Sequence, residues 1–406
     1  MNNLDILIKD LKEKGVQLLV IDNELKIQSP KGLITPEIQK LLIENKSNII
    51  NLLKKEAIKM NFSLFFFSDD LENEQDKYKL LIDSTKMADK NGFYGIWTPE
   101  RHFHKMGNIY PNPAIISGAL STITENVILR AGSVVLPIND PIRVAENWSV
   151  VDNLSKGRVE LSFATGWHIN DFVFEPSNYE KRKDIMFERI DIVKKLWQGE
   201  TIKRKNGANK EIEVEIYPKP YNKNLAIWIT AIGNPETYIQ AGKRGFNLMT
   251  CLLDQDISEL KEKIILYKKE LVNAGYSEKD KKICIFMHTY LDDSMEKVKE
   301  KVREPFKNYL KSTIDLLGKF SQNSDISLDP SKMNENEKEE LLEFAFERYF
   351  KDRTFFGNIE DLREKVIQLH EIGVDEIACL IDFGLDHNSI TQSLEKLSFL
   401  VKNFKA

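Results

Sequence analysis

The chain has 406 residues, of which 42% are hydrophobic, so it can bury a full core and hold more than one folding unit. Its formal net charge is -5, and acidic and basic residues are interspersed, which argues against a nucleic-acid partner or an anionic membrane surface. Charges interrupt the longest apolar runs well before membrane-spanning length, and the N-terminus lacks the apolar stretch of a signal peptide. We therefore expect a cytoplasmic protein that binds neither nucleic acid nor membrane.

Residues 1–56 have a pattern of their own, which predicts a helix, a hairpin and a second helix. Apolar residues at helical spacing predict the first helix, which ends at Gly15 as a C-terminal cap: Leu4, Leu7, Ile8 and Leu11. Two short strands, VQLLVI and ELKIQ, are joined at Asp22–Asn23, a pair that tolerates the positive φ of a tight turn. Thr35 as N-cap and Pro36 at the first helical position begin the second helix.

This N-terminal unit suits either a structural extension of the main body or an interaction module, and the pattern alone favours neither. Its phrase GVQLLVIDNELKIQSPKGLITPEI resembles the TubC-type N-terminal docking domain. Docking domains of this type bind a partner tail in multi-subunit non-ribosomal peptide and polyketide synthases. The resemblance therefore implies that residues 1–56 form a small α+β docking domain whose partner is a synthase subunit.

From Met60 onward, apolar strands alternate with amphipathic helical stretches. Eight segments have the composition of buried strands: 61–67, 93–97, 127–135, 158–164, 226–232, 246–250, 282–290 and 375–382. Eight such strands with intervening helices favour a (β/α)₈ TIM barrel, an α/β fold, over an open doubly wound sheet. We expect this barrel to span residues 60–406.

Two spans do not fit the simple repeat of strand and helix. The segment GETIKRKNGANKEIEVEIYPKP has an Asn206–Gly207 turn between alternating stretches, which predicts an inserted hairpin. Residues 315–350 are charged and turn-rich before they become helical again. We interpret this second span as an insertion near the opening of the barrel that acts as a lid.

In such a barrel the reactive groups lie at the carboxyl ends of the strands, and those ends are polar here. The second strand is followed by Glu100, Arg101, His102, Phe103 and His104. A metal site on His102 and His104 is disfavoured, because alternate residues of an extended segment point apart and no carboxylate-rich strand end supplies further ligands. Capping of the barrel rim would suit one isolated histidine better than four polar groups so close together. We therefore select all of these residues except Phe103 as candidate catalytic residues.

Small or polar residues also mark the ends of three further strands. The residues at or just after these strand ends that we note for a binding role are Gly132, Ser133, Thr165, Trp167, Gly233, Asn234 and Thr237. Gly132–Ser133 interrupts a β-rich run, which suggests a bulge or the close approach of another group to the backbone. A helix begins after Asn234, and the free N–H groups of its first turn suit a phosphate. Taken alone, a helix start of this kind is more often structural than ligand-binding.

Several catalytic motifs are absent from the sequence. The chain has no G-x-G-x-x-G after a strand, no G-x-x-x-x-G-K-[ST] and no G-x-S-x-G. A built-in nicotinamide site, a nucleotide triphosphatase and a nucleophile elbow therefore lack support. Cys251, Cys284 and Cys379 each lie in an apolar run, which is typical of small buried residues in a reducing compartment. No Cys-based metal site is predicted.

From Met60 to the C-terminus the chain resembles the bacterial luciferase-like flavin monooxygenases, and within them the MupA-type branch associated with natural-product assembly lines. Five phrases carry the resemblance: GFYGIWTPERHFH, VLPINDPIRVAENWSVVDNLSKGRVELSFATGW, FERIDIVKKLWQGE, ITAIGNPETYIQAGKRGFNLMT and GVDEIACLIDFG. The resemblance implies reduced FMN as cosubstrate and O₂ as oxidant. Because no dinucleotide fingerprint is present, we expect a separate flavin reductase to supply the reduced FMN.

The resemblance also implies roles for the cluster after the second strand. Glu100 to His104 would lie over the flavin or the substrate, where donors and a general acid or base act. Luciferases have Glu-His-His where this chain has Glu100-Arg101-His102, so Arg101 occupies the position of the luciferase imidazole. A guanidinium cannot act as a base near neutral pH. Proton transfer is therefore assigned to His102 or His104, and charge stabilisation to Arg101.

For the cofactor, the resemblance places the isoalloxazine ring at Gly132–Ser133 and predicts a non-proline cis peptide bond between these two residues. Thr165 and Trp167 would lie beside the flavin. Arg182, or alternatively Lys183, would lie near the flavin phosphate. The phosphate itself would bind at the helix start formed by Gly233, Asn234 and Thr237.

The sequence thus predicts an FMNH₂- and O₂-dependent monooxygenase that oxygenates a carrier-protein-tethered intermediate in non-ribosomal peptide or polyketide biosynthesis. Two alternatives stay open. A deazaflavin-dependent hydride-transfer oxidoreductase would use the same barrel without consuming O₂, and a non-catalytic docking scaffold would bind no flavin. The sequence does not identify the tethered substrate, the atom that is oxygenated or the oligomeric state, for which a homodimer is one option.

Overall fold

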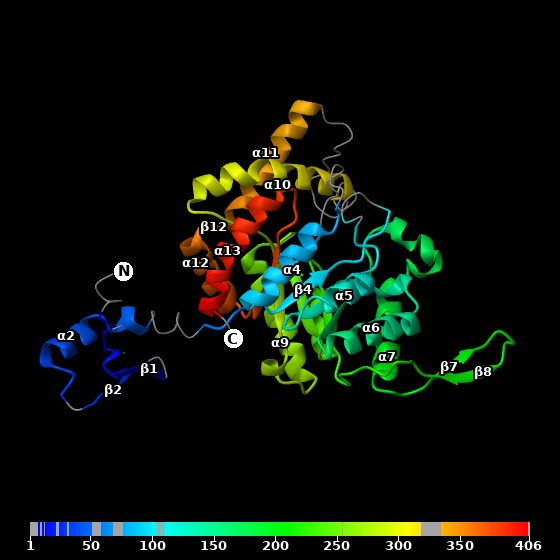
Figure 1. The fold of residues 1–406 in the computed structure, drawn as a ribbon, viewed down its shortest axis with the longest axis horizontal. Coiled ribbons are helices and arrows are strands. Elements are labelled where there is room, and N and C mark those ends of the chain that lie inside the picture. The colour runs from blue at the N-terminus through cyan, green and yellow to red at the C-terminus, as the bar shows by residue number, and fades with distance from the viewer. Residues whose placement is uncertain are drawn as a thin grey trace. The chain divides into compact units, whose positions relative to one another are not determined.

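The structure is a computed structural model, and it divides into two compact units, residues 1–59 with Ala406 and residues 60–405 (Figure 1). The residues that the structure describes are 7–8, 10–11, 13–21, 24–30, 32–50, 58–67, 76–103, 107, 109–253, 255–317 and 334–404.

The first unit contains the helix, hairpin and helix expected from the sequence. Residues 7–13 are helical where described, and the chain turns at Gly15, whose φ of 84° suits a residue without a side chain. Strands β1 (Gln17–Ile21) and β2 (Glu24–Gln28) pair antiparallel. The predicted turn between them, residues 22–23, lies outside the described residues.

Helix α2 (Pro36–Glu44) begins as the sequence predicts. The side chain of Thr35 accepts a hydrogen bond from the backbone N–H of Ile38 at 3.3 Å, and Pro36 occupies the first turn. This unit has its own hydrophobic core, made of six buried side chains: Ile8, Leu11, Val16, Leu18, Leu42 and Ile49. An independent core is what a small domain needs in order to fold as a module.

The second unit is a closed barrel of eight parallel strands (Figure 1). They are β3 (Asn61–Phe65), β4 (Gly95–Thr98), β5 (Ile128–Val135), β6 (Val159–Ala164), β9 (Ala226–Thr230), β10 (Asn247–Cys251), β11 (Ile283–Leu291) and β13 (Glu376–Leu380). Each pairs with the next in this order, and β13 pairs with β3, which closes the barrel. All eight overlap the strands predicted from the sequence, and the (β/α)₈ TIM barrel is confirmed.

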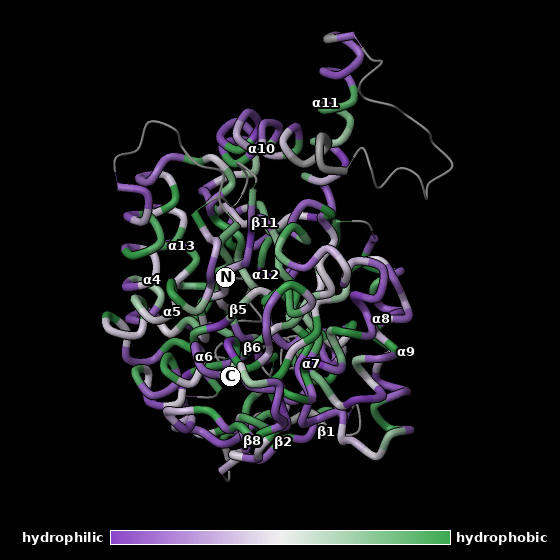
Figure 2. Tube along the Cα trace, turned by 90° about the vertical axis from the view of Figure 1, so that its right-hand side faces the viewer, coloured by the Kyte–Doolittle hydropathy of each residue, from purple (hydrophilic) through white to green (hydrophobic). Residues whose placement is uncertain are grey.

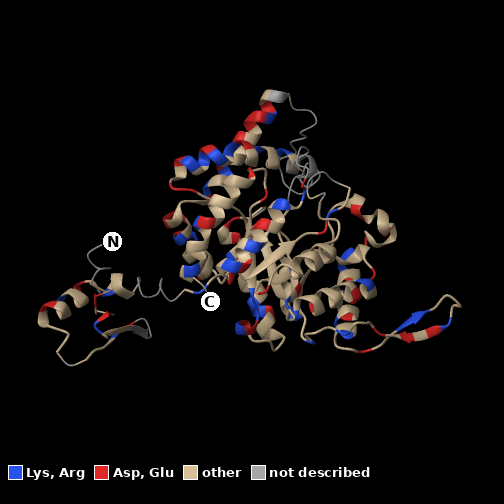
Figure 3. Cartoon of the chain, viewed as in Figure 1, with Lys and Arg blue, Asp and Glu red and all other residues tan. Residues whose placement is uncertain are grey.

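Helices surround the barrel. They are α4 (Lys79–Asn91), α5 (Pro113–Ser121), α6 (Pro141–Ser155), α7 (Arg182–Trp197), α8 (Pro235–Lys243), α9 (Ile257–Asn273), α10 (Met295–Leu317), α11 (Glu335–Asp352), α12 (Ile359–Glu371) and α13 (His387–Phe404). In Figure 2 hydrophobic and hydrophilic residues alternate along them, as expected for helices with one face on the strands and one in solvent. Charges of both signs are interspersed over these helices (Figure 3).

The interior of the barrel near the strand beginnings is closed by a buried ion pair network. Arg130 is fully buried, and its Nη1 lies 2.6 Å from Oε1 of Glu376, while its Nη2 lies 2.7 Å from Oε2 of Glu160. The guanidinium carbon lies 4.4 Å from the ring centroid of Trp97 and 5.1 Å from that of Trp228. Two carboxylates and two aromatic faces thus satisfy the charge of Arg130 within the fold. We call Arg130 and these four side chains the lower layer of the barrel.

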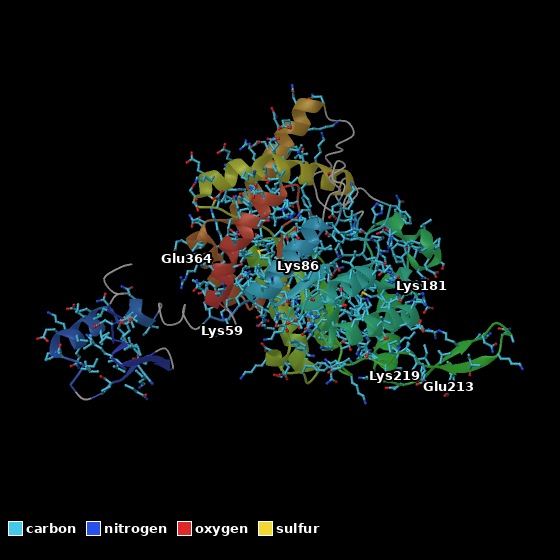
Figure 4. The ribbon with its side chains drawn as sticks, viewed as in Figure 1. Lys59, Lys86, Lys181, Glu213, Lys219 and Glu364 are labelled. Atoms are coloured by element: carbon cyan, nitrogen blue, oxygen red, sulfur yellow. The ribbon has the colours of Figure 1, made fainter. Side chains whose placement is uncertain are left out.

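The predicted hairpin insertion is confirmed. Strands β7 (Ile202–Lys205) and β8 (Glu211–Val214) pair antiparallel and are not part of the barrel sheet. The turn between them closes with a hydrogen bond from the backbone N–H of Asn206 to the carbonyl oxygen of Lys210 at 2.9 Å. The hairpin projects away from the barrel, as the position of the labelled Glu213 shows (Figure 4).

The predicted insertion at 315–350 is described in part. Its borders are helical, because α10 extends to Leu317 and α11 begins at Glu335. Residues 318–333 lie outside the described residues, so the lid interpretation stays a prediction. The sequence did not predict the short strand β12 (Phe355–Gly357), which follows α11 and pairs with the end of β11.

Three further findings bear on the class of protein. Cys251, Cys284 and Cys379 are free and buried, as expected from the sequence. Within the part of the chain that the structure describes, no helix combines the length and the apolar character needed to cross a bilayer. Among the same residues, no three His, Cys, Asp or Glu side chains are grouped so that they could hold a metal ion.

Candidate active site

The polar cluster predicted after the second barrel strand lies at the carboxyl end of β4. This strand has the sequence GIWT, and all four of its residues are buried. Glu100 and Arg101 follow it and remain 7% and 3% exposed. Since water does not reach these groups freely, their hydrogen-bond partners must come from the protein or from a ligand. His104 lies outside the described residues.

The carboxylate of Glu100 is held by three nitrogen atoms. Its Oε2 accepts a hydrogen bond from the backbone N–H of Val135 at 2.7 Å, and its Oε1 accepts one from Nδ2 of Asn139 at 2.8 Å. Nε2 of His102 lies 3.1 Å from the same Oε1. Glu100 therefore connects the end of β4 to the end of β5 and to the turn η1 (Leu136–Ile138) that follows it.

The imidazole of His102 lies between this carboxylate and two aromatic rings. Its ring centroid is 4.9 Å from that of Phe174, in an edge-on arrangement, and 5.7 Å from that of Phe103. The side chain is 12% exposed. An imidazole that is fixed on one side by a carboxylate and still reaches the surface of the site is placed for acid or base catalysis.

Arg101 is buried, and among the described residues no carboxylate lies in ion-pair contact with it. Its Nε and Nη2 have no hydrogen-bond partner among the described residues. The guanidinium carbon lies 4.8 Å from the ring centroid of Trp167 and 5.4 Å from that of Phe67. Burial lowers the pKa of Arg101, and the charges of Asp171 and Tyr309 oppose this shift. The group stays a hydrogen-bond donor, which excludes it as a base.

The predicted bulge in β5 is present. The register between β5 and β6 shifts between Ala131 and Val134, and the peptide bond between Gly132 and Ser133 is cis, as the family resemblance implies. A Cβ atom on Gly132 would lie 2.9 Å from Cε2 of Phe65 and 3.2 Å from Cβ of Trp97. The neighbouring aromatic side chains therefore require glycine at this position, a constraint that the sequence does not reveal.

A cluster of hydroxyl groups lies beside this bulge. Oγ of Ser133 lies 3.2 Å from Oγ of Ser162, which lies 2.9 Å from Oγ1 of Thr230, and the first and third hydroxyls are also hydrogen-bonded. The three residues come from the neighbouring strands β5, β6 and β9. Sequence reasoning found Ser133 and missed Ser162 and Thr230, whose signal was a small polar residue in the second half of an apolar strand.

The end of β6 contributes to the same region. Thr165 is half-buried, and Trp167, which is 39% exposed, packs over Arg101. Asp171, in the turn η2 (Ile169–Phe174), is 2% exposed, and its Oδ1 lies 3.6 Å from Nδ1 of His168. Burial raises the pKa of Asp171, and Arg101 together with His102 opposes this shift. Sequence reasoning did not select Asp171.

The expected phosphate site at α8 is formed by a capped helix start. Oδ1 of Asn234 accepts a hydrogen bond from the backbone N–H of Glu236 at 2.9 Å, and the carbonyl oxygen of Asn234 accepts one from Thr237 at 3.1 Å. Gly233 is half-buried. An anion would contact these N–H groups only in place of this cap, so the phosphate site stays a prediction.

Arg182 is engaged with a neighbouring aromatic residue. Its Nη1 donates a hydrogen bond to the carbonyl oxygen of Tyr179 at 2.7 Å, and its guanidinium carbon lies 4.3 Å from the centroid of the same ring. The preceding Lys181, labelled in Figure 4, lies at the outer edge of the barrel unit. Neither Arg182 nor Lys183 is shown to bind a phosphate, and this assignment also stays a prediction.

Sequence reasoning missed a second polar region, at the ends of β13 and β11. The carboxylate of Asp382 accepts hydrogen bonds from the backbone N–H of Phe67 at 2.9 and 3.0 Å and from the hydroxyl of Tyr110 at 3.4 Å. His288 is buried, and its ring centroid lies 4.4 Å from that of Tyr309. Burial lowers the pKa of His288 to about 3, so this imidazole is neutral at physiological pH.

An open cavity of about 600 Å³ adjoins the His102 side of the site. It is lined by Phe103, Ile169, Asn170, Phe172, Val173, Pro176, Tyr179 and Glu180. The lining is mainly apolar, and the volume lies within the range typical of small-molecule sites. Phe103 connects the cavity to the imidazole of His102.

Enzymes with a parallel (β/α)₈ barrel have their active sites at the carboxyl ends of the strands, which is where these polar groups lie. The family of luciferase-like monooxygenases matches residues 60–376, and the chain belongs to this family. The TubC N-terminal docking domain family matches residues 5–55. Both resemblances noted in the sequence are thus confirmed, and the MupA-type branch stays a prediction.

A named relative supports the same class. The oxygenase component of a flavin-dependent trigonelline monooxygenase from Acinetobacter baylyi is 25% identical over 351 residues, which cover 83% of this chain and 93% of that protein. The chain is accordingly a flavin-dependent monooxygenase of the luciferase-like type.

Two solved structures share the barrel. One is the oxygenating constituent of the 3,6-diketocamphane monooxygenase of Pseudomonas putida, a type II Baeyer–Villiger monooxygenase in complex with FMN. Its TM-score is 0.68 at 18% identity, over 86% of this chain and 99% of that one. An F420-dependent secondary alcohol dehydrogenase has a TM-score of 0.64 at 15% identity, over 86% and 100%. At these identities the likeness shows the fold alone.

Proposed function

We propose that this chain is an oxygenase component that uses reduced FMN and O₂ to oxygenate an intermediate tethered to a carrier protein of a non-ribosomal peptide or polyketide synthase. The observation that carries the proposal is the presence in one chain of a luciferase-like barrel and a TubC-type docking unit. Docking makes the meeting of enzyme and tethered substrate effectively intramolecular, which a freely diffusing substrate would not need. We assign residues 1–56 to docking and residues 60–406 to catalysis.

The residues at the strand ends fit an FMN group. The bulge at Gly132–Ser133 and the hydroxyls of Ser162 and Thr230 offer a polar ledge for the edge of the flavin ring system. Thr165 and Trp167 would flank the ring. The phosphate would bind at the start of α8, at Gly233, Asn234 and Thr237, with Arg182 nearby. FMN is the flavin bound in one structural neighbour of the barrel.

When bound, the reduced flavin supplies two electrons, so that one atom of O₂ enters the substrate and the other leaves as water. The chain's own residues then have separable tasks. Glu100 fixes His102, and His102 or His104 moves a proton. Arg101 donates hydrogen bonds to an oxygen atom that gains negative charge, because its Nε and Nη2 are otherwise unused within the described residues.

The reduced FMN comes from a separate reductase in this proposal. Support comes from the missing dinucleotide fingerprint and from the relative that is named an oxygenase component. The three free, buried cysteines suit a reducing cytoplasmic compartment. Rapid oxidation of NADH or NADPH by the purified protein with FMN alone would contradict the need for a reductase.

The direct test is intact-mass analysis of candidate acyl-carrier proteins after incubation with the full chain, FMN, a flavin reductase, NADH and O₂. A gain of one oxygen atom on the acyl group is expected, and an anaerobic incubation is the matched control. An oxidised carrier that forms without O₂ and only with the deazaflavin cofactor F420 would instead assign hydride transfer. Absence of binding to either flavin would leave the docking scaffold.

A further inference from the structure

A continuous set of hydrogen bonds leads from the turn after β5 to the imidazole of His102. Nδ2 of Asn139 donates to Oε1 of Glu100 at 2.8 Å and to the carbonyl oxygen of Val135 at 3.0 Å. The same Oε1 faces Nε2 of His102 at 3.1 Å. Asn139 is half-buried and Glu100 is buried, so this set lies largely out of solvent.

The backbone of Asn139 is itself held firmly. Its N–H donates to the carbonyl oxygen of Leu136 at 3.1 Å. Its carbonyl oxygen accepts a hydrogen bond from Nη1 of Arg189 at 2.7 Å, and the same Nη1 contacts the carbonyl oxygens of Leu136 and Pro137 at 3.2 and 3.1 Å. Helix α7 therefore fixes the turn from which the Asn139 amide reaches Glu100.

The chemistry of these groups determines the protonation pattern of the imidazole. The backbone N–H of Val135 and the amide of Asn139 both donate to Glu100, so its carboxylate serves as an acceptor. An acceptor at 3.1 Å requires that Nε2 of His102 carries its proton. In the neutral imidazole, Nδ1 then holds the lone pair, and it makes no hydrogen bond to the described residues.

We propose that Asn139 is a positioning residue that fixes Glu100, and through it the Nε2-protonated tautomer of His102, so that Nδ1 of His102 is the proton acceptor of the reaction. The inference rests on the proposed monooxygenase function and deepens it. In the step, the proton of a substrate X–H group moves to Nδ1, the X–H electron pair stays on the substrate, and the resulting imidazolium faces the Glu100 carboxylate. Arg101 cannot accept this proton, because a guanidinium has no free lone pair at this pH.

The tautomer can be measured without cofactor or substrate. Full-length protein labelled with ¹⁵N-histidine is examined by NMR above pH 7.5. The signals of His102 are assigned as those that are missing from the spectrum of His102→Gln. The expected spectrum has Nε2 of His102 at the protonated, pyrrole-type position and Nδ1 at the pyridine-type position. The opposite assignment would overturn the proposal.

The chain offers a matched control for the positioning role. Nδ2 of Asn178 donates to the carbonyl oxygen of Pro137 at 2.8 Å, so Asn178→Ala removes one amide hydrogen bond to the same turn without touching Glu100. We expect Asn139→Ala to reduce kcat/KM for oxygenation about tenfold and to mix the two tautomers of His102 in the NMR spectrum. Asn178→Ala should change kcat/KM less than twofold and leave the spectrum as in wild type. Neither variant should change FMN affinity more than twofold.

Equal loss of activity in both variants, or an unchanged His102 spectrum in Asn139→Ala, would overturn the positioning role and leave Asn139 as part of the fold. If the wild-type chain oxygenates no carrier-bound substrate at all, the proposed function fails. The NMR comparison of the two variants still decides whether Asn139 sets the tautomer. The two failures are therefore distinguishable.

Discussion

Two buried arginines lie inside the same barrel, and their surroundings differ. Arg130, in the lower layer, contacts the carboxylates of Glu160 and Glu376 at 2.7 and 2.6 Å. Burial alone would lower the pKa of Arg130, but the two carboxylates outweigh it and raise the pKa above its usual value. At the strand ends, no carboxylate among the described residues lies in ion-pair contact with Arg101, and burial lowers its pKa.

The difference separates a charge that serves the fold from one that serves a ligand. A buried ion without partners is costly, and a fold tolerates it where a ligand completes its hydrogen bonds. Strands β6 and β13 supply carboxylate partners for Arg130, whereas the aromatic rings of Phe67 and Trp167 cover Arg101. We infer that the lower layer stabilises the barrel, and that Arg101 at the strand ends is available to contact a ligand.

The largest effect is expected in the lower layer. Arg130→Ala leaves the carboxylates of Glu160 and the buried Glu376 without their counter-ion, which should reduce the free energy of unfolding by about 3–5 kcal/mol. Urea unfolding followed by circular dichroism measures the change. Arg101→Ala is the comparison and should cost less than half as much. Equal destabilisation by the two substitutions would remove the contrast between the layers.

At the strand ends the expected effect is on rate. His102→Ala and Arg101→Ala should each lower oxygenation about 100-fold, equivalent to about 2.7 kcal/mol of transition-state stabilisation, because proton transfer and charge stabilisation are lost. FMN affinity, measured by fluorescence titration, should stay within threefold of wild type. A parallel loss of FMN affinity and turnover would move these residues into the cofactor-binding site.

The effect of burying the imidazole of His288 can be tested through the pH dependence of the free energy of unfolding. Its pKa is lowered from 6.5 to about 3 in the folded chain, so only the unfolded chain gains a proton as the pH falls below 6.5. The stability that depends on the neutral imidazole is complete above pH 6.5 and is lost toward pH 3, by about 1.4 kcal/mol per pH unit. His288→Phe keeps an aromatic ring against Phe306 and Tyr309, and it should reduce the stability loss between pH 7 and pH 5 by about 2 kcal/mol.

Urea unfolding at the two pH values, for wild type and His288→Phe, gives this difference directly. His370→Phe is a useful control, because that histidine lies on the surface helix α12 and is exposed. An identical pH dependence in wild type and His288→Phe would show that folding does not lower the pKa of His288.

The smallest effect is expected from removal of the N-terminal unit, which is not part of the barrel. Removal of residues 1–56 should slow oxidation of a substrate on its docked synthase about tenfold at submicromolar protein, because docking supplies a high effective concentration. Flavin binding and turnover of a small thioester surrogate should stay nearly intact. Full-length and truncated protein are compared on both substrates. Undiminished oxidation of the synthase-bound substrate would end the docking role, and loss of the surrogate reaction would make the segment part of the barrel.

Local patterns were sufficient to predict the elements. Apolar runs located all eight barrel strands, and Thr35 with Pro36 located the start of α2, because buried strands and helix caps depend on neighbouring residues. The hairpin at Asn206 followed from its turn residues in the same way. The short strand β12 escaped prediction, since three residues carry too little periodicity.

The candidate site was predicted only where one segment carries it. Glu100, Arg101 and His102 are adjacent in the chain, so the sequence predicts them as one polar cluster. Ser162 and Thr230 did not, because each is an ordinary polar residue in its own strand and becomes notable only beside Ser133. Asp382 was missed for the same reason, since its partner Phe67 is distant in sequence.

The sequence by itself determined the barrel, the separate N-terminal unit and the polar character of the strand ends, because these depend on composition and spacing along one segment. Only the tertiary structure decided which charges are paired. Arg130 lies between Leu129 and Ala131 within an apolar strand, and Arg101 lies between Glu100 and His102 after one, but neither local sequence says which carboxylate meets the guanidinium. The closure of the barrel brings the carboxylates of Glu160 and Glu376 to Arg130, because strand register fixes which side chains meet. Among the described residues it brings no carboxylate into ion-pair contact with Arg101.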